Sequence, residues 1–397
     1  MATWVGPGTY ARSPPSGAFQ GLSHPDIERR LVTQPDPVAL VHDYLTQRGG
    51  AERVVLALAE AFPAAPIHTS LYDPVGTFPE FADLDVHTLP IDRVKTLRTH
   101  HRLALPVLAP AFSRLHVAAG VVVCSSSGWA HGAQTTGRKV VYCHTPARWL
   151  YQTDRYMEGR RRPSSLLLSL LAPALRGWDR RAAASAHRYL VNSNAVRQRV
   201  SDLYGIEAEV VPPPVDVDRQ GTREAVPGLE PGFMLCVSRL LPYKNVEAVT
   251  AAFGHLPDQR LVVVGRGPLA DRITSTSPPN VTVLGQVTDG ALRWLYASSA
   301  GLVAASYEDF GLTPVEAAGF GKPTAALRWG GYLDTTVEGT TGVFFDEPDP
   351  RHIAAAVEKL GASAWSEESL VANAHQYTTQ RFVDRMRAVV AEEGAAC

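Results

Sequence analysis

Short apolar runs alternate with amphipathic segments along the chain from residue 38 onward. In the first half these runs are typical of buried strands and occupy residues 38–42, 66–72, 121–126, 140–144, 189–193 and 209–214. A helix is predicted over 51–62, where one stripe is apolar: Val54, Val55, Leu58 and Phe62. Another is predicted over 195–204, with Gly205 directly after its last residue. Strands and helices that alternate in this way predict a parallel sheet covered by helices.

A loose stretch at 212–232, rich in proline, glycine and charge, separates this pattern from a second one. The alternation then resumes with the runs "FMLCVS", "LVVVG", "VTVLG", "AGLVAAS", "PTAAL" and "GVFF". We therefore predict an α/β protein with two Rossmann-like parallel-sheet domains, at 37–218 and 219–375. Residues 1–36 are predicted to be an extension, and 376–397 a helical segment that crosses back to the first domain.

Two cations follow the first strand of the second domain. Ligands of such sheets bind beyond the carboxyl ends of the strands, which in a two-domain protein line the cleft between the domains. Arg239 and Lys244 lie between a strand that ends near Ser238 and a helix that begins near Asn245. Beside free helix N–H groups they favour a phosphate or diphosphate. Ordinary surface positions are the alternative.

A glycine-rich turn follows a later strand. Gly265, Gly267 and Ala270 fit G-x-G-x-x-A, and Asp289 lies roughly twenty positions later, as in dinucleotide-binding folds. A tight turn is the alternative, because the motif does not open the domain and the helix after it is short. The pattern keeps an NAD-dependent oxidoreductase as a second functional hypothesis.

The stretch "SYEDFGLTPVEAAGFGKP" (306–323) places Glu308 and Glu316 around the start of a predicted helix. Thr313 at the N-cap, Pro314 after it and Glu316 fit a capping box, in which the glutamate closes on its own backbone. Capping does not account for Glu308, nor for Gly311, which lets the backbone approach a ligand. The alternative is a polyol that carries a diphosphate, bound by helix N–H groups and by carboxylates that accept hydrogen bonds from hydroxyls.

Composition restricts the partners more than the fold. Hydrophobic residues make up 45% and charged residues 19%, which is typical of a globular protein. The net charge of -1 and the pI of about 6.9 give no overall field that favours nucleic acid. The four cysteines lack metal-ligand spacing, and three lie in or at the end of strand-like runs, which favours buried thiols in a reducing cytosol.

The most apolar window, 164–175, is too short to span a bilayer. Basic residues on both sides of it allow peripheral contact with an anionic membrane surface, and a solvated charged face beside a core helix is the alternative. The N-terminus lacks the basic and apolar regions of a secretion signal.

The stretch around the paired glutamates resembles the E-x7-E motif of the retaining glycosyltransferases of family 4, which have the GT-B fold. Glu308 and Glu316 are the motif glutamates, with Phe310, Gly311 and Leu312 between them as in the family. Further segments resemble its mannosyltransferase-like branch, which builds cell-envelope polysaccharides: 42–55, 142–151, 191–196, 238–246, 310–323 and 321–345.

The resemblance implies roles for residues of the second domain. Arg239 and Lys244 would hold the donor diphosphate, and Glu308 would contact the hydroxyls of the donor sugar. Glu316 would bind the ribose diol. Main-chain amides after Glu308 would hold the diphosphate, in the segment Phe310, Gly311, Leu312 and Thr313.

The resemblance also implies three contacts outside that segment. His144 would lie over the reacting face of the sugar, although a satisfied loop histidine is the alternative reading. Gly49 and Gly50 would allow close approach of the backbone to the donor, and the backbone of Val287 would meet the base. Asp334 stands where the family has glutamate and is assigned no role.

The function that the resemblance implies is metal-independent transfer of a sugar, mannose favoured, from a GDP- or UDP-linked donor to a hydroxyl acceptor. No cofactor is expected, and the DxD triplets at 83–85 and 216–218 lie in surface-like and linker stretches. Retention is expected by front-face transfer, because no carboxylate is placed for a double displacement. We expect a cytoplasmic enzyme of polysaccharide or glycolipid synthesis, with a non-catalytic sugar-nucleotide-binding protein as a further alternative.

Overall fold

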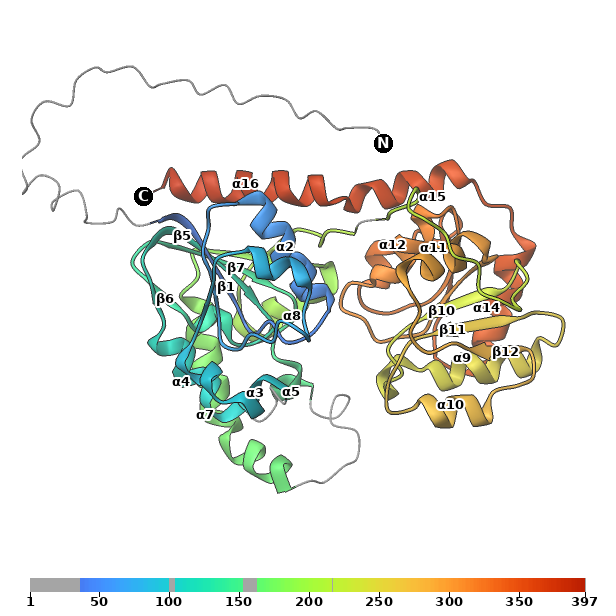
Figure 1. Ribbon diagram of the computed structural model, residues 1–397, viewed down its shortest axis with the longest axis horizontal. Helices are drawn as coiled ribbons and strands as arrows, with labels where there is room; N and C mark the ends of the chain where they lie inside the picture. The colour runs from blue at the N-terminus through green and yellow to red at the C-terminus, as the bar shows by residue number, and fades with distance from the viewer. Residues whose placement is uncertain (1–35, 100–103, 153–162, 216, 397) are drawn as a thin grey trace, which may run out of the picture. The chain divides into compact units, whose positions relative to one another are not determined.

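The computed structural model describes residues 36–99, 104–152, 163–215 and 217–396. Asp36–Cys397 form one compact unit, and within it the strands assemble into two large parallel sheets (Figure 1). The predicted extension, 1–36, lies outside the described residues except for Asp36, which begins the first strand.

The first sheet has seven strands in the order β3-β2-β1-β5-β7-β8-β9. Their bounds are β1 Asp36–His42, β2 Ile67–Thr69, β3 Val86–Thr88, β5 Ala119–Ser126, β7 Arg138–Cys143, β8 Arg188–Val191 and β9 Glu209–Val210. β1 lies between β2 and β5, since Leu40 pairs with Ile67 on one side and with Val123 on the other. The strand order reverses there, so the carboxyl ends of β1 and β5 form a switch point at which such sheets bind ligands. A separate pair joins β4 His116–Val117 to β6 Gln134–Thr135.

Helices cover both faces of this sheet: α2 Gly50–Ala61, α3 Lys95–Thr99, α4 Leu105–Arg114, α5 Arg148–Tyr151, α7 Pro163–Ala184 and α8 Asn194–Tyr204. The apolar stripe predicted for the first of them is confirmed, because Val54, Val55 and Leu58 are buried in α2. Gly205 ends α8 in the left-handed conformation with φ 67°, which fits the predicted helix end.

The second sheet has six strands in the order β12-β11-β10-β13-β14-β15. Their bounds are β10 Met234–Val237, β11 Leu261–Val264, β12 Val281–Val283, β13 Gly301–Ala304, β14 Thr324–Leu327 and β15 Gly342–Phe345. Here the order reverses between β10 and β13. The loops that follow these two strands contain Arg239, Lys244 and Glu308, so the predicted donor residues lie at the second switch point.

The helices of the second domain are α9 Val246–Ala252, α10 Ala270–Thr276, α11 Asp289–Ser298, α12 Leu312–Gly319, α13 Tyr332–Thr335, α14 Pro350–Ala362 and α15 Glu367–Ala374. Strands and helices share one apolar core, in which Leu235, Val263 and Val303 are almost fully buried. Most residues between Pro212 and Gly232, which connect β9 to this domain, belong to no helix or strand.

The last helix, α16 Thr379–Gly394, packs on the first sheet (Figure 1). Its buried residues Phe382, Met386, Val389 and Val390 belong to the same cluster as Leu40 of β1 and Leu58 of α2. The first core therefore contains residues from the far end of the chain.

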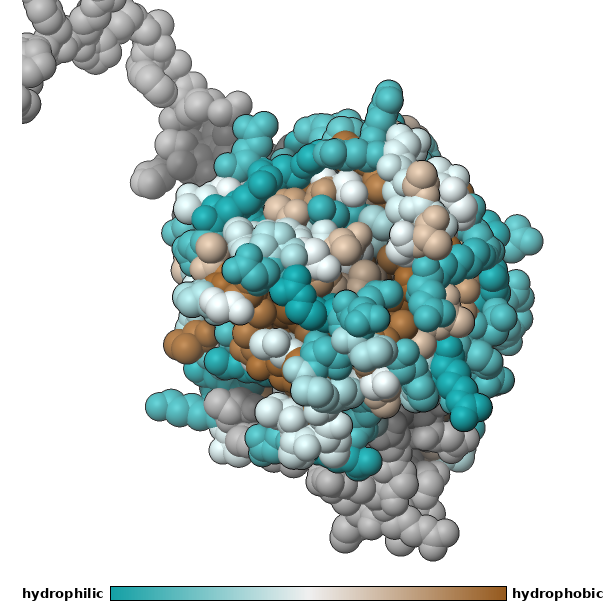
Figure 2. Space-filling model, turned by 90° about the vertical axis from the view of Figure 1, so that its right-hand side faces the viewer, coloured by the Kyte–Doolittle hydropathy of each residue, from teal (hydrophilic) through white to brown (hydrophobic). Residues whose placement is uncertain are grey.

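Large hydrophobic residues on the described surface are spread over several elements: Val75, Val94, Val107, Leu171, Leu333 and Val337. Hydrophilic residues surround the hydrophobic atoms visible in Figure 2. The apolar window at 164–175 lies in α7, and among the described helices none is long and apolar enough to cross a bilayer.

Candidate active site

The loops that follow β10 and β13 hold an ion pair. The ammonium of Lys244 contacts Oε1 of Glu308. The two loops are joined further by Asn245, whose Nδ2 donates to the carbonyl of Ala305 at 2.8 Å. The structure thus brings together two of the predicted residues across the switch point.

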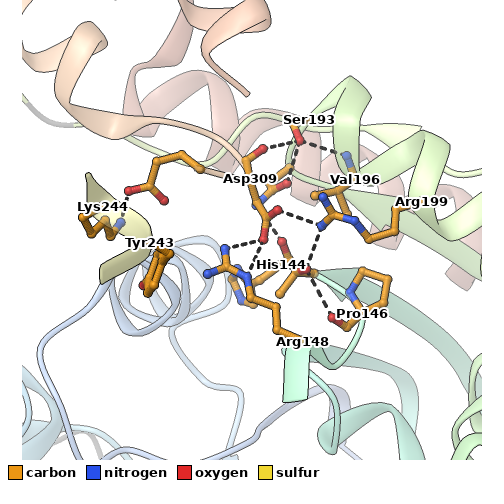
Figure 3. A network of polar contacts seen from close by, with 12 residues as sticks. His144, Pro146, Arg148, Ser193, Val196, Arg199, Tyr243, Lys244 and Asp309 are labelled. Atoms are coloured by element: carbon orange, nitrogen blue, oxygen red, sulfur yellow. Dashed lines mark hydrogen bonds and ion pairs between the residues drawn. The ribbon is translucent and has the colours of Figure 1, made fainter. Parts of the chain in front are cut away.

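Three cationic side chains lie near Tyr243, and two of them, Lys244 and Arg148, are seen in Figure 3. The Lys244 ammonium lies 5.0 Å from the ring centroid, and the Arg148 guanidinium lies 6.0 Å from it. The exposed Arg239 donates from Nη2 to the Tyr243 hydroxyl at 3.4 Å. Because Lys244 is only 7% exposed, its charge acts where water screens little. Arg148 is already paired with the carboxylate of Asp309, so Arg239 and Lys244 are the two cations that suit a polyanion such as a diphosphate.

Gly265 and Gly267 are explained by packing behind this loop. A Cβ on Gly265 would lie 1.8 Å from the carbonyl oxygen of Ser238, and one on Gly267 would lie 2.2 Å from that of Leu240. The residues on either side of Arg239 therefore occupy the space that side chains would need. The glycines position the Arg239 loop, which accounts for the G-x-G spacing without a dinucleotide.

The capping box predicted at the start of α12 is wrong. The helix begins at Leu312 with Gly311 at its N-cap, and no side chain of the described chain caps it. Gly311 has φ 90°, and a Cβ there would lie 2.5 Å from the Tyr332 ring, so packing as well as conformation requires glycine. The Glu316 carboxylate instead accepts a hydrogen bond at 2.6 Å from the hydroxyl of Tyr296.

The start of α12 lies against the start of α2. A Cβ on Gly50 would lie 3.2 Å from Cδ1 of Leu312. At Gly49, the N-cap of α2, a Cβ would lie 2.6 Å from Oε2 of Glu52 in the same helix. Two helix N-termini from different domains thus meet where both sets of predicted backbone contacts were expected.

His144 follows β7 and is tied to the switch point of the first sheet. Its Nε2 lies 2.8 Å from Oγ of Ser125, which also lies 3.1 Å from Nδ1 of His42. Burial, and then the neighbouring His42, lower the pKa of His144 to about 3. The imidazole is therefore neutral near pH 7.

Glu52 was not predicted from the sequence. Its side chain is buried in the first turn of α2, and its Oε2 has no hydrogen-bond partner among the described residues. Burial raises its pKa. Its position beside the two glycines, in an otherwise apolar stripe, is the signal that would have identified it.

Asp309 was also missed, although it follows Glu308 directly. It is 4% exposed, and its carboxylate accepts hydrogen bonds from Nε of Arg148 at 2.9 Å and from Nη1 of Arg199 at 2.7 Å (Figure 3). Burial opposes its ionisation, but the two guanidinium groups outweigh burial and lower its pKa. We call these three residues the Asp309 cluster. An acidic residue directly after a motif glutamate could have been noted as a candidate site residue. The sequence alone does not show that Arg148 and Arg199 are its partners.

Two further residues were named from the sequence. Val287 lies between the edge strand β12 and α11, partly buried against the second core, and not at the switch point. Asp334 accepts two hydrogen bonds of 2.7 Å from Asn194, one from its backbone N–H and one from its Nδ2. Asp334 therefore joins α13 to the start of α8.

Two family models match adjacent parts of the chain. The model described as Glycosyltransferase Family 4 matches residues 48–219, and that described as Glycosyl transferases group 1 matches residues 221–377. Two similar proteins are D-inositol 3-phosphate glycosyltransferases. That of Mycobacterium avium (strain 104) is 31% identical over 227 residues, which cover 50% of this chain and 53% of the relative. That of Mycobacterium sp. (strain JLS) is 27% identical over 206 residues, or 46% of each chain.

The chain thus spans about half the length of the curated relatives it matches, whereas solved structures match over nearly their whole length. Anabaena Alr3699/HepE in complex with UDP-glucose has a TM-score of 0.63 at 18% identity, covering 91% of this chain and 100% of that one. The apo lipopolysaccharide outer core galactosyltransferase WaaB has a TM-score of 0.61 at 13% identity, covering 90% and 99%. At such identities the likeness concerns the fold, and it confirms the predicted fold class.

Proposed function

Because the chain belongs to the family 4-like glycosyltransferases with a GT-B fold, we propose that it transfers a sugar from a nucleoside-diphosphate donor to a hydroxyl group. The observation that carries this proposal is the grouping of Arg239, Lys244 and Glu308 at the switch point of the second sheet. The cations suit the diphosphate, and the carboxylate suits the sugar hydroxyls. Activity of this kind also fits the position of the site at the carboxyl ends of parallel strands.

Each part of the sugar nucleotide would contact its own set of residues in this arrangement. The diphosphate would lie against Arg239, Lys244 and the first amides of α12, between Phe310 and Thr313. Glu308 would accept from the sugar hydroxyls, and Glu316, held by Tyr296, from the ribose diol. Val287 would meet the base through its backbone.

Bond cleavage would place negative charge on the departing diphosphate. Arg239 and Lys244 would stabilise that charge, and the loss of one such donor commonly costs ~3 to 4 kcal/mol of transition-state stabilisation. We propose retention of configuration by front-face transfer, in which a phosphate oxygen takes the acceptor proton. Glu308 is already paired with Lys244, which makes its carboxylate a weak nucleophile. The two cations would do this work without a metal ion.

His144 would act as a neutral group. A pKa of about 3 leaves its imidazole uncharged at neutral pH, so it would hydrogen-bond to a sugar hydroxyl and would not supply a proton. Gly49 and Gly50 would let the start of α2 approach the sugar.

We propose mannose, linked to GDP, as the favoured donor, with UDP-linked sugars as the second choice. The first follows from the resemblance to the mannosyltransferase-like branch, and the second is supported by the UDP-glucose complex of the similar HepE fold. The acceptor would be a hydroxyl of a glycan or glycolipid. Inositol phosphate belongs among the acceptors to test, since the matched relatives are named for it. A cytoplasmic enzyme that contacts the inner face of the membrane through the region of α7 would fit these acceptors.

A thermal-shift panel of UDP, GDP, UDP-glucose, GDP-mannose and NADH tests the proposal, because a ligand that binds only the folded state raises its stability. We expect a nucleoside diphosphate or its sugar to stabilise the protein and NADH to have no effect. Release of nucleoside diphosphate with each acceptor class then separates an enzyme from a protein that only binds the donor.

Lys244→Ala supplies the matched test of the site. We expect loss of sugar transfer and weaker stabilisation by nucleotide. Lys359→Ala is the control, because Lys359 is exposed and pairs with Glu338, which lies just before the edge strand β15. Stabilisation by NADH alone, or equal effects of the two substitutions, would contradict the proposal.

A further inference from the structure

The Asp309 cluster has no part in the roles proposed so far. Arg148 comes from α5 and Arg199 from α8, both in the first domain, whereas Asp309 lies in the loop after β13 of the second domain. The cluster therefore joins one domain to the loop that contains Glu308.

Each side chain of the cluster is held in more than one place. Arg148 contacts Oδ2 of Asp309 through both Nε and Nη2. Arg199 contacts Oδ1 and also donates from Nη1 to Oγ of Thr145 at 3.0 Å. Both oxygens of the carboxylate are therefore occupied by cations from the first domain. A buried carboxylate with two guanidinium partners stays ionised and keeps its geometry.

The helical turn that contains Arg148 is fixed by the first core. α5 has four residues and would not be stable alone. Trp149 stacks on Trp129 with ring centroids 4.7 Å apart, and the Tyr151 hydroxyl donates to Asp179 at 2.8 Å. Arg176 of α7 donates to the carbonyl of Leu150 at 3.0 Å. Three successive residues thus anchor the turn, which leaves Arg148 directed at Asp309.

The backbone of the Glu308 loop is held from both domains as well. The hydroxyl of Ser193, at the N-cap of α8, donates to the carbonyl of Asp309. On the other side the N–H of Gly331 donates to the carbonyl of Glu308 at 3.0 Å. Since Glu308 and Asp309 are consecutive, their Cα atoms stay 3.8 Å apart and a shift of one moves the other.

We propose that Arg148 and Arg199 are positioning residues for sugar transfer: by holding Asp309 they fix the carboxylate of Glu308 against the donor sugar. This inference rests on the proposed function of Glu308. The residues that would bind the nucleotide are also held without the Glu308 side chain. The backbone N–H of Lys244 donates to the carbonyl of Leu241 at 2.9 Å, and Glu316 accepts from the hydroxyl of Tyr296. Loss of either arginine therefore lowers kcat and leaves nucleotide affinity nearly unchanged.

The test uses the full chain with Arg148→Gln, Arg199→Gln and Arg148→Lys. Each single variant leaves one guanidinium or ammonium beside Asp309, so the carboxylate is not stranded and the fold is retained. Arg328→Gln is the matched control, because Arg328 is exposed and pairs with Glu338 and Asp346. Hydrogen–deuterium exchange of residues 306–311, affinity for UDP and GDP, and kcat are measured for all four.

For both glutamine variants we expect about tenfold faster exchange in 306–311 than for the control. We expect kcat to fall roughly 10- to 100-fold, as for a misplaced reacting group, with nucleotide affinity within about threefold of wild type. Arg148→Lys should recover only part of kcat, because an ammonium cannot reproduce the paired guanidinium contacts.

Unchanged exchange in 306–311, or nucleotide affinity that falls as far as kcat, would overturn the inference. Failure of the proposed function has a different signature. If neither UDP nor GDP binds the wild-type protein, the transferase proposal fails, while the exchange measurement still decides whether the arginines hold the loop.

Discussion

The three carboxylates at this site have different hydrogen-bond and ion-pair partners. Glu308 is paired with the Lys244 ammonium, Asp309 with two guanidinium groups, and Glu316 with the neutral hydroxyl of Tyr296. A carboxylate offers about four acceptor sites, so one phenol hydroxyl leaves Glu316 able to accept from a diol. The negative charge of Glu316 is therefore available to bind a ligand and is not needed to cap α12.

Glu316→Gln should weaken binding of UDP or GDP by roughly tenfold, because hydrogen bonds to a charged acceptor are the stronger ones. The melting temperature should stay close to that of wild type, since no capping bond is lost. Isothermal titration and a melting curve measure the two effects, with Glu358→Gln on the exposed face of α14 as control. A drop of several degrees with unchanged affinity is the result of a lost cap, and it would contradict this reading.

His144 should make the folded state sensitive to acid. Its pKa is about 3 in the folded protein and near 6.5 in the unfolded chain. Between these values the unfolded state binds a proton that the folded state does not, so stability is lost as the pH falls through this window. His144→Gln should make the decline of melting temperature between about pH 6.5 and pH 4 shallower. The exposed His352→Gln is the control, and parallel curves for wild type and His144→Gln would count against a buried neutral imidazole.

The sequence located Arg239, Lys244 and Glu308 because their placement depends only on which strands they follow. It misplaced the start of α12, since the helix begins where Gly311 turns against Tyr332, a contact that local pattern does not encode. Arg148 lies in the segment 142–151, which resembles the family, but its role depends on Asp309, a partner 161 positions away.

At the scale of the elements, α16 is the last helix of the chain, yet its buried side chains belong to the core of the first domain. Its apolar stripe completes the face of the first sheet that α2 also covers. The sequence analysis predicted a helical segment over 376–397 that crosses back to the first domain, but not the residues against which it packs. Its packing partner depends on the path of the chain after α15.

Met386→Ala should destabilise the first domain by about 2 to 5 kcal/mol, because the fully buried side chain leaves a cavity. Denaturant unfolding followed by tryptophan fluorescence measures the loss, since Trp129, Trp149 and Trp178 lie in the first domain. Arg381→Ala, exposed on the same helix, should change stability by less than about 0.5 kcal/mol. Equal effects would mean that α16 is not packed as described.

At the scale of the whole molecule, the two domains are joined by more than the connection between β9 and β10. Asp334 joins α13 to the start of α8, and the Asp309 cluster joins the loop after β13 to α5 and α8. The backbone N–H of Val215 donates to the carbonyl of Tyr377 at 2.8 Å, so the outgoing and returning segments are themselves paired. The sequence predicted two domains, a linker and a returning helical segment. It did not predict these side-chain contacts, because they form only when both sheets are in place.

Limited trypsin treatment should cut after the exposed Arg223, or after the partly exposed Arg219, without separating the halves. The C-terminal fragment keeps α16, whose buried residues belong to the first core. We expect two bands on a denaturing gel and one co-eluting species on gel filtration, with uncut protein as the reference. Separate elution of the fragments under native conditions would refute this.

The position of α16 in the first core also has a consequence during synthesis. The first sheet is complete once residue 210 has been made, yet part of its apolar surface has no cover until Phe382 through Val390 emerge from the ribosome. At ≈ 5–20 residues per second that interval lasts on the order of ten seconds or more. The domain that is translated first is therefore the last to be finished, and it is the one for which a nascent chain would most need a chaperone.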